Sequence, residues 1–283
     1  PTDRDPANLG GNSGATICFD INNDGYMDLL TSEIVHWDVG ANSDSSEILV
    51  NYKDPNVFFI RPGNKKTGLT RTDAQPIWDH GDMTATVFDF DNDGWPDIYI
   101  GASDYPGNKG LLYHQSSKLK FEQVSFDDYF EHSRAHGMAA ADFDRDGDMD
   151  LVVGHSHMRC EGNSGKDCYP TTEVRFFENQ MSAGSNWIQL RLEGGEGSNR
   201  MAIGARVTVS AGAITQTQDV DGGHGHFGAQ RDFTLHFGLG KSCLAQVKVT
   251  WPNKTQSTQA FELNGNAVYT LKQGESPKVW KAD

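Results

Sequence analysis

Three short segments of this chain concentrate carboxylates at a fixed spacing. In the clearest of them, Asp142, Asp144, Asp146 and Asp150 occupy positions 1, 3, 5 and 9 of an acidic loop, and Gly147 occupies position 6. Carboxylates so close together repel one another unless a cation lies between them. Hard divalent cations prefer oxygen ligands, and glycine at position 6 allows the sharp turn that folds a loop around an ion. The segment therefore predicts a Ca²⁺ site.

The same pattern occurs twice more, and the first ligands of the three loops lie 69 and then 53 residues apart. The first loop has an amide in place of a carboxylate at position 3, a substitution that keeps an oxygen ligand. We predict about three bound Ca²⁺ ions. The predicted side-chain ligands are Asp20, Asn22, Asp24 and Asp28 in the first loop, Asp89, Asp91, Asp93 and Asp97 in the second, and Asp142, Asp144, Asp146 and Asp150 in the third.

The loops are not of the helix–loop–helix type. That type needs a bidentate Glu at position 12, where this chain has Thr31, Ile100 and Val153. The segments after the loops are short, β-rich and bounded by turn residues, which is typical of buried strands. The predicted unit is therefore a strand, a calcium loop and a second strand.

The spacing of the predicted strands suggests the larger architecture. Each interval between loops holds about four strands, and four-stranded units at a period of 50–70 residues are typical of β-propeller blades. Further strands are predicted at residues 47–51, 57–60, 110–114, 119–124 and 172–177, with a turn-rich connection at 61–79. Residues 186–273 alternate apolar and polar side chains with a period of two and predict a small β-sandwich or barrel.

Two family resemblances rest on these motifs. Residues 14–178, and best of all His136–Gly154, resemble FG-GAP/VCBS calcium-binding blade repeats. That resemblance implies that main-chain oxygens of Tyr26, Trp95 and Asp148, at position 7, complete the three sites. Motifs at 186–192, 198–200, 203–207, 236–240 and 247–252 follow the order seen in the ASPIC/UnbV domain, which closes cartilage-acidic-protein-like chains. We therefore expect an all-β chain with propeller blades at 1–185 and an ASPIC/UnbV-like domain at 186–283.

Charge and hydropathy exclude several classes of function. The formal charge is −15, with 24 Lys and Arg against 39 Asp and Glu, and no basic stripe offers a surface to phosphates. We therefore expect no nucleic-acid partner. No apolar run is long enough to predict a transmembrane segment.

Four cysteines bear on the compartment. Cys160 and Cys168 flank a polar loop that a disulfide would close, and we predict that bridge; an alternative pairs Cys18 with Cys243. A disulfide and Ca²⁺ sites of this kind both fit an oxidising, calcium-rich environment. The sequence thus predicts a secreted, extracellular protein, with the periplasm or cell surface as related settings.

Two functions remain open. The first is a non-catalytic module for binding or assembly, whose partner is a protein or a carbohydrate ligand. The second is a metal-dependent lyase or hydrolase acting on carbohydrate, in which His80, His136, His155 and His157 hold a transition metal or act as acid and base. These histidines are equally interpretable as ordinary loop residues that bond the backbone.

The number of blades poses a problem. Three blades do not close a propeller, which typically needs four to eight, and open blades leave exposed sheet edges. The sequence also starts at Pro1 rather than Met. We expect either a fragment of a longer chain, or one chain of an assembly in which other chains complete the propeller, or an additional degenerate blade within the long units.

Overall fold

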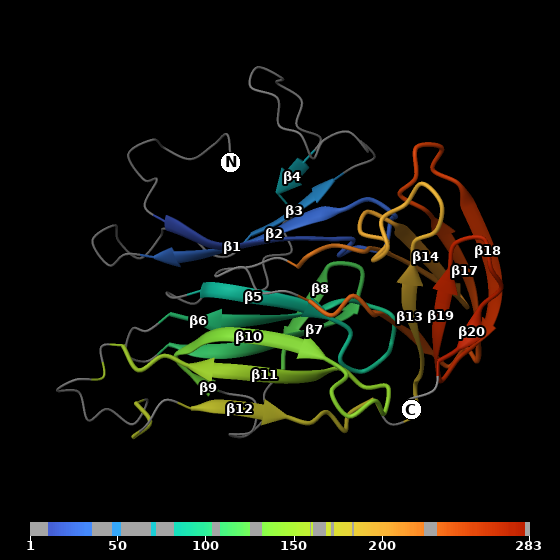
Figure 1. The fold of residues 1–283 in the computed structure, drawn as a ribbon. Coiled ribbons are helices and arrows are strands. Elements are labelled where there is room, and N and C mark those ends of the chain that lie inside the picture. The colour runs from blue at the N-terminus through green and yellow to red at the C-terminus, as the bar shows by residue number, and fades with distance from the viewer. Residues whose placement is uncertain are drawn as a thin grey trace, which may run out of the picture.

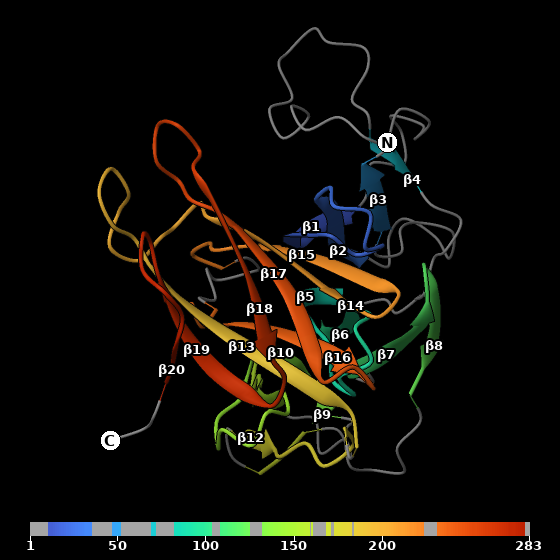
Figure 2. The same ribbon diagram turned by 90° about the vertical axis from the view of Figure 1, so that its right-hand side faces the viewer.

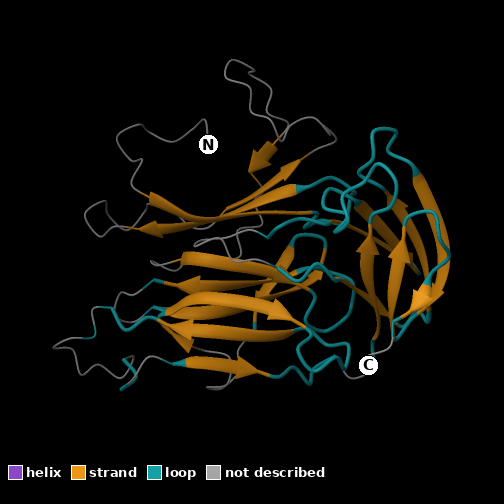
Figure 3. Ribbon diagram, in the orientation of Figure 1, coloured by secondary structure: helices purple, strands orange, loops and turns teal. Residues whose placement is uncertain are grey.

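The part of the chain that the structure describes consists of β-strands, turns and loops (Figures 1 and 3). The computed structural model describes residues 11–35, 47–51, 69–71, 82–103, 108–124, 132–158, 160, 168–170, 173–182, 184–223 and 231–280. These residues form no helix, and so none that is long and apolar enough to cross a membrane. The all-β fold is as predicted. The predicted strand at 57–60 lies outside the described residues.

Three antiparallel sheets form the N-terminal part, and each is a meander of neighbouring strands. The first contains β1 (Gly11–Phe19), β2 (Asp28–Val35), β3 (Glu47–Asn51) and β4 (Leu69–Arg71). The second contains β5 (Asp82–Phe88), β6 (Asp97–Ala102), β7 (Lys109–Ser117) and β8 (Lys120–Gln123), and the short β9 (His132–Ser133) pairs with β7. The third contains β10 (Ala135–Ala141), β11 (Asp150–His155) and β12 (Val174–Phe177).

The strand–loop–strand units form as predicted, because each acidic loop joins the first two strands of a sheet. β1 pairs with β2, β5 with β6 and β10 with β11, all antiparallel. One prediction was wrong in detail. The segment 61–79, expected as a turn-rich connection, includes β4, which pairs with β3. Its three residues gave no strand pattern, and the pairing comes from the neighbouring strand rather than from local preference.

The three sheets stack face to face (Figure 1). Alternate residues of β6 point to opposite faces, as the period of a strand requires. Ile98 and Ile100 pack in a cluster with Ile17 and Leu30 of the first sheet, whereas Tyr99 packs in a cluster with Leu151 of the third. Every residue of β6 is buried. The second sheet is therefore the middle layer of a stack.

The third sheet leaves its outer face open. Its strand β12 turns Phe177 towards the second sheet, while Val174 and Phe176 on the other face are 71% and 49% exposed. Phe143 of the adjacent loop is also 49% exposed, and its ring packs edge-on against Phe176 at 5.6 Å between centroids. Met181, which follows β12, is exposed as well. The end of the stack is an apolar surface.

The C-terminal part is a sandwich of two four-stranded sheets, which resolves the predicted choice between sandwich and barrel (Figure 2). One sheet has the order β16 (Leu235–Gly240), β13 (Asn186–Glu193), β19 (Ala267–Lys272) and β20 (Lys278–Val279). The other has the order β15 (Ile214–Asp219), β14 (Arg206–Ala211), β17 (Leu244–Thr250) and β18 (Thr258–Asn264). β13 and β19 are parallel, and the other described pairs are antiparallel.

The alternating pattern of the C-terminal sequence builds the core of this sandwich. In β17, Ala245, Val247 and Val249 are buried and the residues between them are exposed. They pack in one cluster with residues of the opposite sheet, including Ile188 and Phe237. Burial of a side chain of this size contributes about 1.5–3 kcal/mol. The sandwich therefore has its own hydrophobic core, made from residues 188–271.

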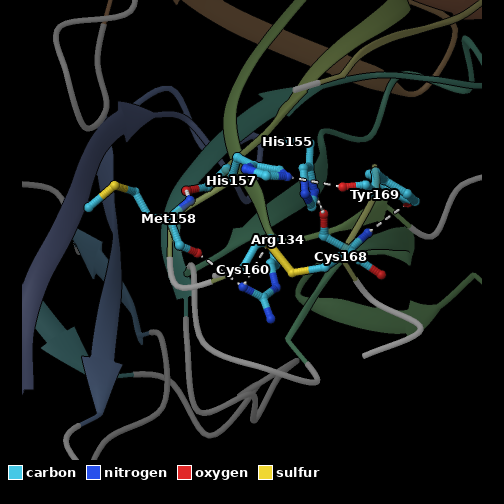
Figure 4. The surroundings of a disulfide bond; sticks show 9 residues. Arg134, His155, His157, Met158, Cys160, Cys168 and Tyr169 are labelled. Atoms are coloured by element: carbon cyan, nitrogen blue, oxygen red, sulfur yellow. Dashed lines mark hydrogen bonds between the residues drawn. A yellow bond between two sulfur atoms is a disulfide. The ribbon is translucent and has the colours of Figure 1, made fainter. Parts of the chain in front are cut away.

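The predicted Cys160–Cys168 disulfide forms, with 5.8 Å between the Cα atoms (Figure 4). The alternative Cys18–Cys243 bridge does not form, and both of these cysteines are free. Cys18 lies in β1 of the first sheet, whereas Cys243 is an exposed residue of the sandwich, just before β17.

Candidate metal centres

The three acidic loops share one backbone conformation. Position 1 directly follows the first strand of each hairpin, and position 9 begins the second strand. Positive φ recurs at positions 4 and 6, with 55° at Asn23, 59° at Asn92, 66° at Arg145, 87° at Gly25, 91° at Gly94 and 97° at Gly147. Glycine adopts this region at little cost, and asparagine tolerates it better than most residues. The repeated sequence pattern thus encodes a repeated loop geometry.

Backbone amides aim the carboxylates of each loop inwards. In the second loop, Asp89 accepts hydrogen bonds from the amides of Asp93 at 3.2 Å and Gly94 at 2.8 Å. Asp97 accepts from the amide of Phe90 at 3.0 Å, so position 9 is fastened to position 2. The other two loops repeat both features. The amide at position 6 lies 2.8 Å from the position-1 carboxylate in the first loop and 3.1 Å from it in the third. The amide at position 2 lies 3.1 Å from the position-9 carboxylate in the first loop and 3.0 Å from it in the third.

Carboxylate oxygens converge in the second and third loops. Ligand atoms of Asp89, Asp91 and Asp97 lie within 4.8 Å of one another, and so do those of Asp142, Asp144 and Asp146. Oxygens on opposite sides of a Ca²⁺ ion are about 4.6–5.2 Å apart, because each bond is about 2.3–2.6 Å long. The spacing of the donors therefore suits one such cation in each loop.

Burial makes the second cluster costly without a counter-charge. Asp97 is fully buried and Asp89 is 7% exposed. The pKa of each carboxyl is raised well above its usual value, first by burial and then by a neighbouring carboxylate. Removal of charged groups from water costs several kcal/mol per ion unless they are paired. A cation at this point would lower both pKa values and offset that cost.

The first loop holds a buried side-chain amide that has no hydrogen-bond partner among the residues that the structure describes. Asn22 at position 3 is 1% exposed, and neither its Oδ1 nor its Nδ2 makes a hydrogen bond. The fully buried Asp20 lies at position 1, and burial raises the pKa of its carboxyl to about 7. In the third loop, Oδ1 of Asp142 is likewise buried. These oxygen donors fit a hard cation such as Ca²⁺.

A histidine that the sequence reading did not single out joins the second loop. Nε2 of His114 lies 3.2 Å from Asp91 and 3.6 Å from Asp93. Contact with Asp91 and then with Asp93 raises the pKa of the imidazole to about 10. The register between β6 and β7, in which Ile98 pairs with Tyr113, brings His114 beside this loop. The sequence alone did not indicate that His114 lies beside this loop, because strand register depends on pairing between strands rather than on local sequence.

Side-chain amides at position 4 connect each loop to the next. Asn23 of the first loop donates to the carbonyl of Gly94 in the second, at 2.9 Å. Asn92 of the second loop donates to the carbonyl of Gly147 in the third, at 3.0 Å. The position-4 asparagine and the position-6 glycine therefore form a repeated contact between successive loops.

A second set of amides makes the reverse connection. Gln115, in β7 of the second sheet, donates to the carbonyl of Ile21 in the first loop, at 2.9 Å. Asn179 after the third sheet donates to the carbonyl of Phe90 in the second loop, at 2.5 Å. The backbone amides of Gln115 and Asn179 also donate to the position-9 carboxylates of their own loops, at 2.7 and 2.8 Å. The three loops are thus one connected structure rather than three separate turns.

The histidines considered for a transition-metal site lie elsewhere. His155 Nδ1 lies 2.8 Å from the carbonyl of Ser133, and His157 Nε2 lies 3.1 Å from the carbonyl of Tyr169, beside the disulfide (Figure 4). His136 lies at an irregularity in the pairing of β10 with β11. Among the described residues, the groups of side chains close enough to share a metal do not include these three histidines. His80 lies outside the described residues.

The loops and the sandwich both match known families. Residues 89–153, which include the second and third loops, match the FG-GAP-like repeat. Residues 195–278 match ASPIC and UnbV. FG-GAP repeats imply β-propeller blades, in agreement with the stacked meanders.

Cartilage acidic protein 1 from three animals is similar in sequence. The human protein is 25% identical over 214 residues, covering 72% of this chain and 30% of its own length. The Xenopus tropicalis protein is 27% identical, covering 64% and 27%, and the Mus musculus protein is 24% identical, covering 76% and 33%. The chain thus spans about a third or less of the length of these relatives.

A solved structure of a candidate cell adhesion protein from Bacteroides uniformis also aligns, with 12% identity over 72% of this chain and 93% of the other, at a TM-score of 0.20. At that score it does not define how the layers are arranged. The two family matches follow the same order along the chain as the stacked sheets and the sandwich. The chain therefore has a segment that matches the FG-GAP-like repeat, followed by a segment that matches ASPIC and UnbV, and it is similar in sequence to cartilage acidic protein 1.

Proposed function

We propose that this chain is a calcium-binding β-propeller module for extracellular binding or assembly, with one Ca²⁺ ion in each acidic loop and no catalytic role. The buried, unpaired side chain of Asn22 carries this proposal. An amide in this position is unfavourable by about 1–3 kcal/mol unless a partner takes its oxygen. A cation held by Asp20, Asn22, Asp24, Asp28 and the main-chain oxygen of Tyr26 would be that partner.

Calcium is the cation that best suits these loops. The donors are carboxylates, one amide and main-chain oxygens, and Ca²⁺ accepts 6–8 such ligands in irregular geometry. Mg²⁺ requires a nearly ideal octahedron at about 2.0–2.1 Å and releases its water reluctantly. Main-chain oxygens of Trp95 and Asp148 would complete the second and third sites. The ions would supply positive charge that ties the start and end of each loop together.

An extracellular setting agrees with three features of the chain. The Cys160–Cys168 disulfide is of a kind that persists in oxidising compartments. Extracellular modules bind Ca²⁺ with dissociation constants of about 10⁻⁴–10⁻³ M, so sites of that type are filled where Ca²⁺ is millimolar. The relatives are named cartilage acidic protein 1, and a role outside the cell is the natural extension to this chain.

The open face of the third sheet supports an assembly role. Val174 and Phe176 are exposed on the side of β12 opposite the second sheet, and the exposed Phe143 packs against Phe176 there. The second sheet buries equivalent apolar residues against both of its neighbours. We infer that the outer face receives another blade, from further sequence or from another chain. Sedimentation velocity of this chain tests the second source: Phe176→Asp should reduce association, and association that is unchanged would contradict it.

Chelation is the direct test of calcium binding. We expect EGTA to lower the midpoint of thermal unfolding, and Ca²⁺ but not Mg²⁺ to restore it. Each filled site adds about 2.7 kcal/mol when free Ca²⁺ is about 100 times the dissociation constant. Asp97→Asn should reduce the calcium-induced gain, whereas Glu262→Gln, which removes a carboxylate from an exposed strand of the sandwich, should retain it. A midpoint that is the same in EGTA and in Ca²⁺ would contradict the proposal.

A further inference from the structure

The sandwich reaches into the third acidic loop through one buried side chain. Gln189 of β13 is 6% exposed, and its Nε2 donates to Oδ2 of Asp142, the first predicted ligand of that loop, at 2.5 Å. The same nitrogen lies 3.4 Å from Nδ1 of His236 in β16. The two hydrogens of a side-chain amide allow both contacts. A residue of the sandwich is therefore bonded directly to a predicted calcium ligand.

His236 continues this connection to the second loop. Its Nε2 lies 2.6 Å from Oδ1 of Asn92, which is fully buried. Nδ2 of Asn92 donates to the carbonyl of Gly147 and to Oδ1 of Asp148, at 3.0 and 3.1 Å. Because the amide nitrogen is the donor there, Oδ1 must accept, so Nε2 of His236 carries the hydrogen. Burial lowers the pKa of His236 to about 4, which keeps the ring neutral and leaves Nδ1 free to accept from Gln189.

The backbones of the two parts also approach closely. A Cβ atom at Gly238 of β16 would lie 2.1 Å from Oδ2 of Asp89, the first residue of the second loop. A Cβ atom at Gly147 would lie 1.7 Å from the indole of Trp187 in β13. The amide of Gly240 donates to the carbonyl of Asn92 at 2.8 Å. Only glycine fits such distances, so this interface depends on backbone contact as well as on side chains.

The third loop differs from the other two at position 4. Asn23 and Asn92 each bond the following loop, but the third loop has Arg145 at this position. Its guanidinium lies over the ring of Trp280, 4.2 Å from the centroid. At position 4, where the first and second loops contact the next blade loop, the third loop thus contacts the sandwich instead.

We propose that the C-terminal sandwich forms the outer shell of the second and third calcium sites, so that calcium binding and docking of the sandwich stabilise each other. This inference rests on the proposed function. Gln189 holds the carboxylate of Asp142, and His236 holds Asn92 within the second loop. These are positioning residues, because they touch the loops and not the ion.

The expected strength of this coupling can be taken from metal sites in general, where groups that hydrogen-bond the ligands without touching the metal affect metal affinity. Loss of such a group typically weakens metal affinity about 10–100-fold. Coupling between two binding events is reciprocal, so removal of calcium must weaken docking of the sandwich by the same factor. The first loop provides an internal comparison for Gln189, since the hydrogen bonds described for Asp20 come from the backbone of its own loop, and the sandwich acts on this carboxylate through the charge of Arg206 in β14.

The position-6 glycines allow each site to be measured separately. The amides of Gly25, Gly94 and Gly147 donate to the first carboxylate of their own loops, so their NMR signals report the three loops individually. In a calcium titration of the full chain, Gln189→Leu should weaken binding at Gly147 about 10–100-fold and leave binding at Gly25 unchanged. Gln246→Leu is the matched control, since Gln246 is an exposed residue of β17 bonded to Glu262.

Hydrogen exchange of the wild-type chain tests the reverse direction without any variant. The amide of Gly240, bonded to Asn92 across the interface, should exchange about 10–100-fold faster after calcium is removed, whereas the amide of Val247 in the sandwich core should not change. Unchanged exchange at Gly240, or unchanged affinity at Gly147 in Gln189→Leu, would overturn the coupling while three sites still bind calcium. Failure of the wild-type chain to bind calcium would instead overturn the proposed function.

Discussion

Replacement of Asn22 by leucine separates a calcium ligand from an ordinary buried residue. The two side chains are similar in size, and Asn22 is 1% exposed with both of its polar atoms unpaired. Leucine removes those two buried, unpaired atoms, and with them the oxygen at position 3. The substitution should therefore have opposite effects without and with calcium.

The magnitudes follow from these two changes. Without calcium, loss of an unpaired buried amide should raise the free energy of unfolding by about 1–3 kcal/mol. With free Ca²⁺ at about 100 times the dissociation constant, the wild-type site adds about 2.7 kcal/mol, and the variant should lose that gain. For a chain of this size, each kcal/mol shifts the unfolding midpoint by about 2–4 °C. Asn22→Leu should thus unfold at a higher temperature than the wild type in EGTA and gain less from calcium.

Differential scanning calorimetry in EGTA and in Ca²⁺ measures both effects. Asn22→Asp serves as the matched control, because it provides the carboxylate that Asp91 and Asp144 provide in the other loops. That variant should be less stable than the wild type in EGTA, owing to an added buried charge, and should gain at least as much from calcium. If Asn22→Leu lowers the midpoint equally in both conditions, Asn22 is a structural residue and the reasoning fails.

Three further substitutions test separate parts of the structure. Asp97→Asn should lower the free energy of unfolding by about 2.7 kcal/mol when free Ca²⁺ is about 100 times the dissociation constant, because the second site loses a buried ligand. In EGTA the loss should be smaller, because removal of a buried carboxylate without a counter-charge offsets the hydrogen bond that the NH₂ group of asparagine cannot accept; urea unfolding in both conditions measures this, and an equal loss in both would contradict it. Cys160→Ser should lower the free energy of unfolding by about 2.5 kcal/mol, because the unfolded chain is no longer constrained by the short loop that the bridge to Cys168 closes. Reduction of the disulfide in the wild-type chain should lower it by the same amount, and a different change would contradict the prediction. His132 is fully buried, and burial is the main reason that its pKa is lowered to about 4. The imidazole of the unfolded chain therefore binds a proton at a higher pH than that of the folded chain, and the free energy of unfolding falls as the pH drops from about 6.5 to 4. Urea unfolding at pH 7 and pH 4 measures this loss of stability, and His132→Phe should reduce the difference between the two pH values by up to about 3 kcal/mol. A difference that is the same in the variant and the wild type would refute the prediction.

The sequence predicted the loops well because their pattern is local. Aspartates at alternate positions and glycine at position 6 are sufficient to define a turn that places carboxylates together. The strands beside the loops were predictable because they are short, β-rich and bounded by turn residues. The sandwich was predictable from period-two alternation, and Val247 and Val249 do alternate with exposed residues. The disulfide was predictable because its cysteines flank a short polar segment.

The contacts between loops could not be predicted in the same way. Asn92 and Gln189 are 97 residues apart in sequence, and their shared network depends on how the sandwich docks on the blades. His114 likewise joins the second loop through strand register, which the local pattern does not define. Asn23 and Asn92 did offer a signal, because the same residue type occurs at position 4 of two loops and tolerates positive φ.

Native mass spectrometry of the full chain tests the central claim most directly. The chain is first freed of metal with EGTA, exchanged into a volatile buffer and then titrated with Ca²⁺. We predict that binding saturates at three Ca²⁺ ions per wild-type chain and at two ions per chain of the Asn22→Leu variant. Saturation at fewer than three ions in the wild-type chain, or equal numbers of bound ions in the wild type and the variant, would contradict it.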